Sequence, residues 1–325
     1  MKLLTYKANN LEAHQIGVLI NQLVYNLNNY FGNISLVKLI QIEDYKDQVA
    51  SLISKNDCLK HDINDITVLA TIPKPNSFRD AYAFREHVAT ARKNRGAEII
   101  AEFDQFPVFY FSNHNAVFAD KEEIELMPDH FEKLDYELEI AIVIGKKGKN
   151  ILSKDADKHI AGFCILNDLS CRRLQIEEMK LNLGPAKGKD FASVIGPYLV
   201  TSEDLKNNCV KTPFGNKYKL EMSCTVNGEL LSKGNTIDMN WTFAEIIERA
   251  SYGVELYPGD IIGSGTVGTG CLLEINGTEK IKNPNYSERW LKNGDEIEMF
   301  INGLGNIKNK IIKANSDHSI LKLKK

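Results

Sequence analysis

The stretch "LDYELEIAIVIG", Leu134 to Gly145, places two carboxylates directly before an unbroken apolar run. Side chains of a strand alternate between its faces, so Glu137 and Glu139 point one way while Tyr136 and Leu138 point the other. Two interpretations fit this pair. One is the solvated face of an edge strand, where two like charges cost little. The other is a site for a hard divalent cation, because adjacent carboxylates repel each other unless an ion lies between them. The second interpretation requires further acidic residues from elsewhere in the chain.

The charge of the 325-residue chain is nearly balanced, with 40 Lys and Arg against 43 Asp and Glu and a net charge of -3. This balance predicts no nucleic-acid partner and no membrane-surface partner. No apolar run approaches the roughly 20 residues of a membrane span. The N-terminal stretch is interrupted by polar residues such as Lys7 and Glu12, which argues against a secretion signal. We therefore expect a cytoplasmic protein.

Six cysteines are scattered along the chain without a Cys-x-x-Cys pair and without a histidine at the spacing of a zinc site. We expect them to be reduced thiols. Cys171 follows Cys164 by seven residues, but no histidine lies near it in the sequence, so the pattern does not favour a nucleophilic cysteine.

The order of apolar and polar segments predicts a small N-terminal domain, residues 1–72, followed by a larger domain, residues 73–325. In the first, residues 12–32 predict an amphipathic helix and residues 65–75 a strand. Residues 77–96 predict a second helix, with Ser77 as its cap and Gly96 as its end. The remaining expected elements are short strands at 107–111, 138–145, 162–170, 196–200, 220–231, 260–274 and 294–312, interrupted by a helix at 243–251. Many strands with few long helices indicate a β-rich α+β fold.

The glycine-bearing loop "GSGTVGTG", Gly263 to Gly270, superficially resembles a phosphate-binding loop. It lacks the Gly-Lys-Ser/Thr ending of such loops and lies between two expected strands. We interpret it as a tight turn that lets the backbone approach a ligand closely.

Asp80, His87 and Asp168 each have an ordinary explanation when considered alone. Asp168 ends the apolar stretch "GFCILND", where an aspartate is typical of a cap. Asp80 lies in the first turn of the expected helix, where an acidic side chain complements the helix dipole. His87 follows two turns later on the same face and would be a surface histidine. The alternative is that both aspartates join the glutamate pair around a cation.

Seven short motifs in order along the chain resemble the fumarylacetoacetate hydrolase family, and the resemblance runs from about Ser77 to Ile312. The motifs are "RDAYAFREHVATARKNRG", "FPVFYF", "LDYELEIAIVIG", "ILNDLSCRRLQ", "GPAKGKDFASVIGPYLV", "LYPGDIIGSGTVGTGCLLE" and "WLKNGDEIEMFINGLGNIKN". The resemblance implies a C-terminal mixed β-sandwich roll of the fumarylacetoacetase type, and a homodimer.

The resemblance also implies one bound divalent cation, Mg²⁺ or Ca²⁺, with Mn²⁺ as a third option. The positions that match the family's ligands are Asp80, Glu137, Glu139 and Asp168. A set of carboxylate oxygens suits a hard ion and offers no soft ligand that would select zinc or copper.

For catalysis, the resemblance implies that His87, oriented by Glu274, activates water. A histidine suits this role because its pKa lies near neutrality. The matching donors to a developing oxyanion are Arg95, Gln175 and Lys189, and the matching substrate contacts are Tyr82, Tyr110, Arg172 and Thr266. Cationic and amide donors fit the task because charge builds up on a carbonyl oxygen as water attacks.

Two departures from the family pattern leave the substrate open, because Met179 replaces a substrate-binding tyrosine and Leu169 replaces an aromatic residue. Our first hypothesis is a metal-dependent hydrolase that cleaves a carbon–carbon bond in a β-diketo acid, such as fumarylacetoacetate or an acylpyruvate. The alternative is a 2-oxo-acid decarboxylase, tautomerase or sugar-acid dehydratase that uses the same metal site. A metal-binding protein without catalysis is disfavoured, because the matching His, Glu, Lys and Gln residues are all present.

Overall fold

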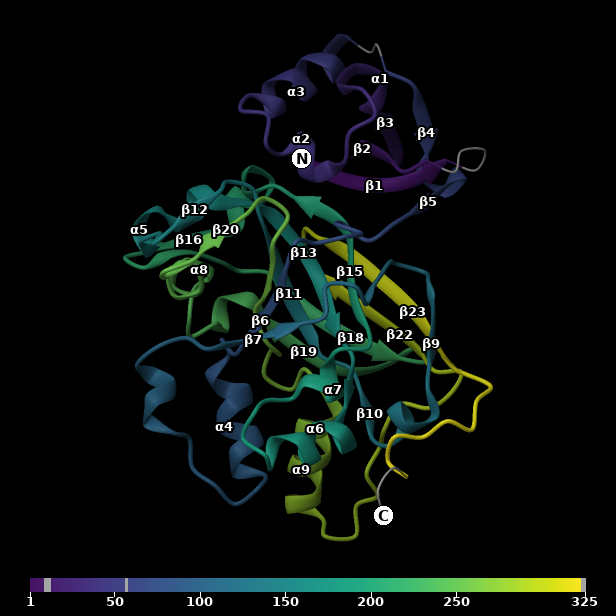
Figure 1. Cartoon of the computed structure of the whole chain (residues 1–325), viewed down its shortest axis with the longest axis vertical. Helices are drawn as coiled ribbons and strands as arrows, with labels where there is room; N and C mark the ends of the chain where they lie inside the picture. Colours follow the sequence, from purple (N-terminus) through teal and green to yellow (C-terminus); the bar gives the residue numbers. More distant parts are fainter. Residues whose placement is uncertain (9–12, 56–57, 323–325) are drawn as a thin grey trace.

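The central strand β11 (Leu138–Ile144) organises the rest of the chain, and all seven of its residues are buried. It pairs antiparallel with β13 (Ile160–Asp168) on one side and with β21 (Ile261–Gly263) on the other. The computed structural model describes residues 1–8, 13–55 and 58–322, and within this part of the chain β11 belongs to a twelve-stranded sheet (Figure 1). A strand that packs against protein on both faces needs apolar side chains throughout, which explains its unbroken apolar run.

The large sheet runs in the order β4-β3-β2-β1-β15-β13-β11-β21-β6-β7, with β5 paired to β1 and β8 paired to β15. Neighbouring strands are mostly antiparallel, but β21 is parallel to β6 and β15 is parallel to β8. The bounds of these further strands are β1 (Lys2–Ala8), β2 (Gln15–Ile20), β3 (Leu23–Asn26), β4 (Lys60–Asp62), β5 (Ile66–Val68), β6 (Phe78–Ala81), β7 (Phe109–Ser112), β8 (Val117–Phe118) and β15 (Ser193–Val200).

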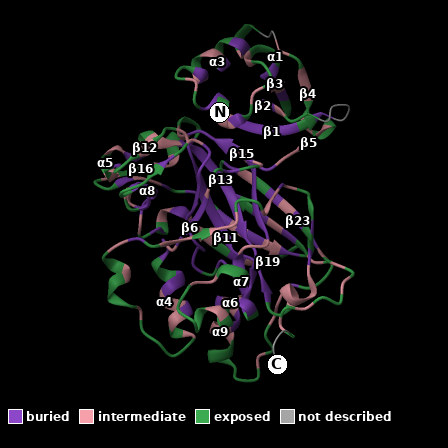
Figure 2. Ribbon diagram, in the orientation of Figure 1, coloured by how far each residue is buried: buried purple, intermediate pink, exposed green. Residues whose placement is uncertain are grey.

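A second sheet of five strands, in the order β19-β18-β22-β23-β9, packs against the large one. Ile140 and Ile142 from β11 share one apolar core with Met222, Met299 and Ile307 of the second sheet. Where the two sheets face each other, their strands consist largely of buried residues (Figure 2). The strands are β9 (Glu123–Leu126), β18 (Glu221–Val226), β19 (Glu229–Asn235), β22 (Glu296–Ile301) and β23 (Gly305–Lys313). These packed mixed sheets confirm the predicted β-rich α+β class.

The remaining elements are short and lie around the two sheets. The strands are β10 (Leu134–Asp135), β12 (Gly148–Lys149), β14 (Ser170–Cys171), β16 (Cys209–Thr212), β17 (Gly215–Tyr218) and β20 (Glu255–Leu256). The helices are α1 (Asn28–Phe31), α2 (Leu36–Leu39), α3 (Tyr45–Lys55), α4 (Arg85–Lys93), α5 (Ser153–Ala156), α6 (Arg172–Met179), α7 (Ala186–Lys189), α8 (Phe243–Ser251) and α9 (Leu272–Lys282). Of the residues described, no helix is both long enough and apolar enough to cross a membrane.

The N-terminal residues continue the large sheet, because β1 pairs with β15 through Lys2 opposite Val200 and Leu3 opposite Leu199. Helices α2 and α3 lie with β1, β2 and β3 in the N-terminal part of the molecule (Figure 1). They bury Leu36, Leu39 and Val49 in a second apolar core. That core also contains Ala141 and Val143 of β11, together with Leu166, Ile195 and Ile261 of neighbouring strands. The N-terminal helices therefore share a core with the central sheet.

The amphipathic helix expected at residues 12–32 is wrong where the chain is described, and its first residue, Glu12, lies outside the described residues. Strands β2 and β3 pair antiparallel over most of this stretch, joined at Asn21 and Gln22. These two residues have φ values of 47° and 69°, the left-handed conformation that a two-residue hairpin turn requires. Only the short helix α1 follows. The strand expected at 65–75 is likewise shorter, since β5 ends at Val68.

The single helix expected at 77–96 is divided into strand β6 and helix α4. All four residues of β6 are buried between β21 and β7, so pairing with neighbouring strands overrides the local helical pattern. Asp80 therefore lies on a strand, and it does not share a helix face with His87. The strand expected at 260–274 also ends early: β21 stops at Gly263, and Glu274 lies in the first turn of α9.

The helix expected at 243–251 is confirmed as α8 with identical bounds. Its start carries a capping box, in which the Thr242 side chain accepts from the Glu245 backbone N–H and the Glu245 carboxylate accepts from the Thr242 backbone N–H. The local sequence signal and the buried face of this helix agree, which explains the accurate boundaries.

We predict that Ile142→Ala lowers the free energy of unfolding by about 2 to 5 kcal/mol, the usual cost of truncating a fully buried aliphatic side chain. Ile142 is 0% exposed at the centre of β11. Urea denaturation followed by circular dichroism measures the change. Val210→Ala, at a position 45% exposed, is the control and should change stability by less than about 0.5 kcal/mol. Equal losses in both variants would contradict the central role of β11.

Candidate active site

Four carboxylates converge at one end of the large sheet, and their ligand atoms all lie within 4.8 Å of one another. Asp80 comes from β6, Glu137 directly precedes β11, Glu139 lies on β11, and Asp168 ends β13. The strands β6, β21, β11 and β13 are consecutive neighbours, so their register brings these positions together. All four side chains are buried, and β11 is a central strand. The solvated edge-strand interpretation of the glutamate pair is therefore wrong.

Two glycines let the backbone after β21 approach the cluster. Gly265 has φ of 78°, and its N–H donates to Asp80 Oδ1 at 3.1 Å and to Glu139 Oε2 at 3.0 Å. At Gly263, an added Cβ would lie 2.3 Å from Asp80 Oδ1 and 3.1 Å from Glu139 Oε2. The loop is thus a tight turn whose backbone closely approaches the carboxylates, and a side chain at position 263 would displace them.

Lys189 and Arg172 supply the positive charge beside the cluster. The Lys189 ammonium is buried, pairs with Asp168 Oδ2 at 2.7 Å and also contacts Glu137. Arg172 Nη2 lies 2.8 Å from Glu137 Oε1. Burial alone would raise the pKa of Glu137, but Lys189 and Arg172 outweigh it and lower that pKa to about 2. Glu137 is therefore a stable anion.

Asp80 and Glu139 receive no such compensation: within the described residues, neither forms an ion pair with Lys or Arg. In the protein without a cation, burial and the nearby Asp168 raise the pKa of Asp80 to about 7. Burial and Asp80 raise the pKa of Glu139 well above its ordinary value. Burial also raises the pKa of Asp168, although Lys189 opposes this effect, so Glu137 alone of the four has a lowered pKa and the cluster lacks positive charge. This all-oxygen, charge-deficient set fits a hard divalent cation.

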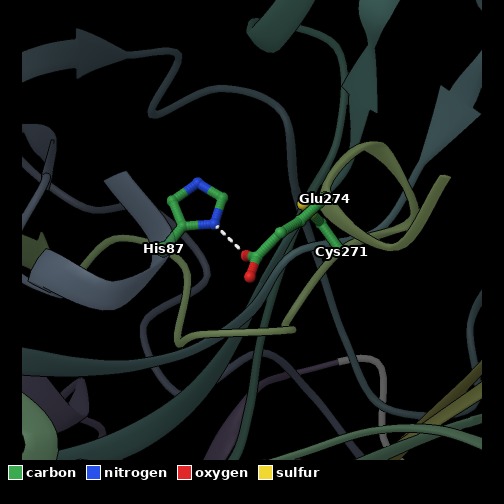
Figure 3. Close-up of side chains that lie close together, drawn as sticks. All are labelled: His87, Cys271 and Glu274. Atoms are coloured by element: carbon green, nitrogen blue, oxygen red, sulfur yellow. Dashed lines mark hydrogen bonds and ion pairs between the residues drawn. The ribbon is translucent and has the colours of Figure 1, made fainter. Parts of the chain in front are cut away.

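His87 and Glu274 form a buried pair (Figure 3), and His87 lies close enough to Glu137 for its charge to act on that carboxylate. His87 lies near the start of α4 and Glu274 near the start of α9, and His87 Nδ1 lies 2.7 Å from Glu274 Oε2. The other carboxylate oxygen, Oε1, accepts from the Thr269 N–H at 2.9 Å. These contacts fix the orientation of the imidazole. Only 6% of His87 is exposed, so the surface-histidine interpretation is wrong.

The predicted substrate contacts and donors surround the same centre, with one exception. Their observed contacts are Tyr110 Oη donating to Asp168, the Tyr82 ring edge-on to the His87 ring at 5.9 Å, Thr266 Oγ1 donating to Glu139 at 3.5 Å, and Gln175 Oε1 accepting from Arg172 at 2.9 Å. Arg95 differs in that it is exposed and its Nε donates to the Ala91 carbonyl at 3.0 Å, although its charge also acts on nearby Tyr82. The structure does not place Arg95 among the buried charged groups.

Asp135 is a buried residue of the site that the sequence interpretation missed. Its carboxylate accepts from the backbone N–H groups of Leu272 and Leu273 at 2.7 and 2.9 Å, at the start of α9. It also accepts from Arg172 Nε at 2.8 Å. Asp135 therefore connects the helix that carries Glu274 with the arginine that pairs with Glu137. The alternation that identifies Glu137 and Glu139 extends back to position 135 and was the available signal.

Comparison with known proteins agrees with this geometry. Residues 76–312 match the family model "Fumarylacetoacetate (FAA) hydrolase C-terminal". The chain belongs to the fumarylacetoacetate hydrolase family. It is 32% identical over 207 residues to "Oxaloacetate tautomerase FAHD2A, mitochondrial" of Homo sapiens, a match that covers 63% of this chain and 59% of the relative. It is 29% identical over 253 residues to "Oxaloacetate tautomerase YisK" of Bacillus subtilis, covering 77% and 75% of the two chains.

Solved structures show that the fold of this family extends over nearly the whole chain. The fumarylacetoacetate hydrolase of Exiguobacterium antarcticum superposes with a TM-score of 0.72 at 22% identity, covering 97% of this chain and all of that one. A maleylpyruvate hydrolase of Sphingobium sp. SYK-6, solved with a manganese(II) ion and pyruvate, superposes with a TM-score of 0.70 at 19% identity and the same coverage. The family thus includes proteins named as hydrolases and others named as tautomerases.

We predict that Glu139→Gln abolishes stabilisation by a divalent cation. At a free ion concentration about 100 times the dissociation constant, Mg²⁺ or Mn²⁺ should stabilise the unmodified protein by about 2.7 kcal/mol. The variant should gain almost nothing, because it loses one charged ligand. Thermal unfolding with and without the ion measures the effect. Glu123→Gln, at an exposed position, is the control and should respond like the unmodified protein. A full response in Glu139→Gln would remove Glu139 from the site.

We also predict that the chelator-treated protein loses stability relative to Asp80→Asn as the pH rises from about 4 to about 7. The folded protein holds the Asp80 proton up to a pKa of about 7, whereas the unfolded chain releases it near the ordinary pKa of 3.8. Between these values the folded state binds more protons, so raising the pH disfavours folding. Asp80→Asn removes the titrating carboxyl and therefore its contribution to the pH dependence of stability. Urea unfolding of both proteins across this range measures the difference, and a difference independent of pH would contradict the prediction.

Proposed function

We propose that this chain is a divalent-metal-dependent hydrolase that cleaves a carbon–carbon bond in a small dicarbonyl acid, such as fumarylacetoacetate or an acylpyruvate. The observation that carries the proposal is the buried His87–Glu274 pair beside the carboxylate cluster. A histidine oriented by a carboxylate is suited to take a proton from water, and a cation held next to it is suited to hold an acid with two adjacent oxygens.

Mg²⁺, Ca²⁺ or Mn²⁺ fits the proposed site, because Asp80, Glu137, Glu139 and Asp168 offer only oxygen ligands. When bound, such an ion supplies the positive charge that attracts and polarises the oxygens of a 2-oxo acid. The fold relative that was solved with manganese(II) and pyruvate supports both parts of this proposal.

The residues of the chain divide the remaining tasks. With Nδ1 of His87 bound to Glu274, Nε2 is the nitrogen that accepts a proton from water. The water oxygen bonds to a carbonyl carbon, the adjacent carbon–carbon bond breaks, and the departing carbon receives a proton, so one water is consumed and two acids or an acid and a ketone result. Lys189 directs hydrogens at Glu137 and Asp168, and an ammonium with three hydrogens has one more to donate to the oxyanion.

A second candidate is tautomerisation of a 2-oxo acid, and the names of the relatives favour it. Proteins called oxaloacetate tautomerases match this chain at 29% to 34% identity. Here His87 would carry a proton between a carbon and the enol oxygen, and no water would be consumed. The two candidates use the same residues and differ in their products.

We predict that His87→Ala lowers turnover at least about a hundredfold while Mg²⁺-induced stabilisation is retained, because other side chains hold the ion. Glu274→Gln should cost less, since it keeps the shape of the pair and loses only the charge that supports the imidazolium. Turnover is measured on fumarylacetoacetate, acylpyruvates and oxaloacetate. His318→Ala, at an exposed position, is the control. A loss below about threefold in His87→Ala would contradict a general-base role.

Product analysis in water enriched in heavy oxygen separates the two candidates. Hydrolysis places one oxygen from water in a product carboxylate and yields two molecules, whereas tautomerisation yields a single isomer of the substrate. Turnover of oxaloacetate to its enol with no cleavage of any diketo acid would replace the hydrolase proposal with the tautomerase one.

A further inference from the structure

A second group of metal-ligating side chains lies beside the carboxylate cluster. His87, Cys271 and Glu274 each offer one ligand atom, and these atoms all lie within 4.8 Å of one another (Figure 3). All three residues are buried. His87 comes from α4, Cys271 directly precedes α9, and Glu274 lies on its first turn. The family resemblance pairs His87 with Glu274, but no sequence pattern adds Cys271, which is 184 positions from His87.

The trio offers the number and types of protein ligands found in a zinc site with one open position. Bonds of about 2.0 to 2.3 Å from zinc to nitrogen, oxygen and sulfur place ligand atoms about 3.3 to 3.8 Å apart. Ligand atoms within 4.8 Å of one another would need to shift by about 1 Å to reach these separations. The hydrogen bond between His87 Nδ1 and Glu274 Oε2 must open for both groups to face an ion. Three protein ligands leave the fourth position for water.

The chemistry of the two neighbouring clusters differs. Asp80, Glu137, Glu139 and Asp168 offer oxygens alone, which suits hard ions. The trio offers a thiol, an imidazole and a carboxylate, a mixture that suits Zn²⁺, Co²⁺ or Cd²⁺. The positive charge of the nearby Arg172 is already paired with Asp135 and Glu137, so it does not stand unpaired against a second cation.

A cavity borders one member of the trio, Glu274. Its volume is about 550 Å³, and it lies between β19 and α9. Glu274 and Thr269 form part of its wall, and the exposed Lys233 and Lys282 also line it. The cavity therefore brings solvent-accessible space next to Glu274.

We propose that His87, Cys271 and Glu274 bind a borderline cation such as Zn²⁺, and that the bound ion inhibits the enzyme. On binding, the Cys271 thiol releases its proton to solvent, and the thiolate, the imidazole and the carboxylate each bond to the ion. The histidine and its orienting carboxylate are then withdrawn from proton transfer. Binding is independent of the proposed function, whereas the inhibition rests on it.

Cobalt(II) absorption tests binding directly, because a thiolate ligand produces an intense charge-transfer band that carboxylate ligands do not. The protein is kept in excess Mg²⁺ to fill the carboxylate cluster and is titrated with Co²⁺. We expect one equivalent to give the band and one equivalent of Zn²⁺ to remove it. Cys271→Ser should abolish the band, and His87→Ala should weaken Co²⁺ binding at least about tenfold. Cys164→Ala removes another fully buried thiol and should keep the band.

Two results would overturn the proposed site: no thiolate band in the unmodified protein, or an undiminished band in Cys271→Ser. Loss of the band in Cys164→Ala would also overturn it. Thermal unfolding with Mg²⁺ verifies that each variant is folded.

Inhibition is tested with a substrate that the unmodified enzyme turns over in excess Mg²⁺. We expect Zn²⁺ to inhibit the unmodified protein and Cys164→Ala, and we expect Cys271→Ser to require at least about a hundredfold more Zn²⁺ for the same fractional loss of its own Zn²⁺-free turnover. Equal inhibition of Cys271→Ser would show that Zn²⁺ acts at the carboxylate cluster and would contradict the inhibitory role. If no substrate is turned over, the proposed function fails, and the cobalt titration still decides the site.

Discussion

Four carboxylates buried at neighbouring strand ends are the constraint around which this structure is built. At a separation near 4.8 Å and an effective dielectric constant of 20, each pair of ionised groups repels by about 3 to 4 kcal/mol. A folded domain is stable by only about 5 to 15 kcal/mol in total, so several such repulsions cannot stand uncompensated. Lys189, Arg172 and the N–H of Gly265 each offset part of the cost. A divalent cation would offset the repulsion that these groups leave uncompensated.

The charged groups also link elements that are far apart in the sequence. Asp135 accepts from the first N–H groups of α9 and from Arg172, and Arg172 pairs with Glu137. Helix α9 carries Glu274, whose carboxylate contacts the imidazole of His87 on α4. The proposed proton-transfer pair and the carboxylate cluster thus share one continuous set of buried ionic and hydrogen-bonded contacts. Removing Arg172 or Lys189 would leave its carboxylate partners as uncompensated buried charges, which is strongly destabilising.

Local sequence patterns identified the parts of the fold in which local and tertiary preferences agree. The apolar run of β11 and the capped helix α8 are examples. Local patterns gave the wrong prediction at β6, where strand pairing overrode a helical pattern. They also gave the wrong prediction at the hairpin turn of Asn21 and Gln22, which contains no glycine. The strand expected at 260–274 ended early because the chain turns at Gly265 to approach the carboxylates.

The candidate site was predictable to the extent that its residues match family motifs. The spacing of Glu137 and Glu139 gave a reason for a cation, and the resemblance supplied Asp80, Asp168, His87 and Glu274. Arg95 also matches by position, but it is exposed, and its role stays a prediction. No local pattern could place Cys271 beside His87, because only the packing of α4 against α9 brings them together.

The pairing of β1 with β15 has a consequence for any shortened form of the protein. Leu199 and Val200 are fully buried, and the N-terminal residues cover one face of the sheet through Ala141, Val143 and Ile195. A chain that began after residue 72 would leave part of β15 as an unpaired strand edge flanked by a bare apolar surface. Exposed edges of this kind associate readily with other strands. The N-terminal segment therefore also acts as a cover that keeps the sheet from self-association.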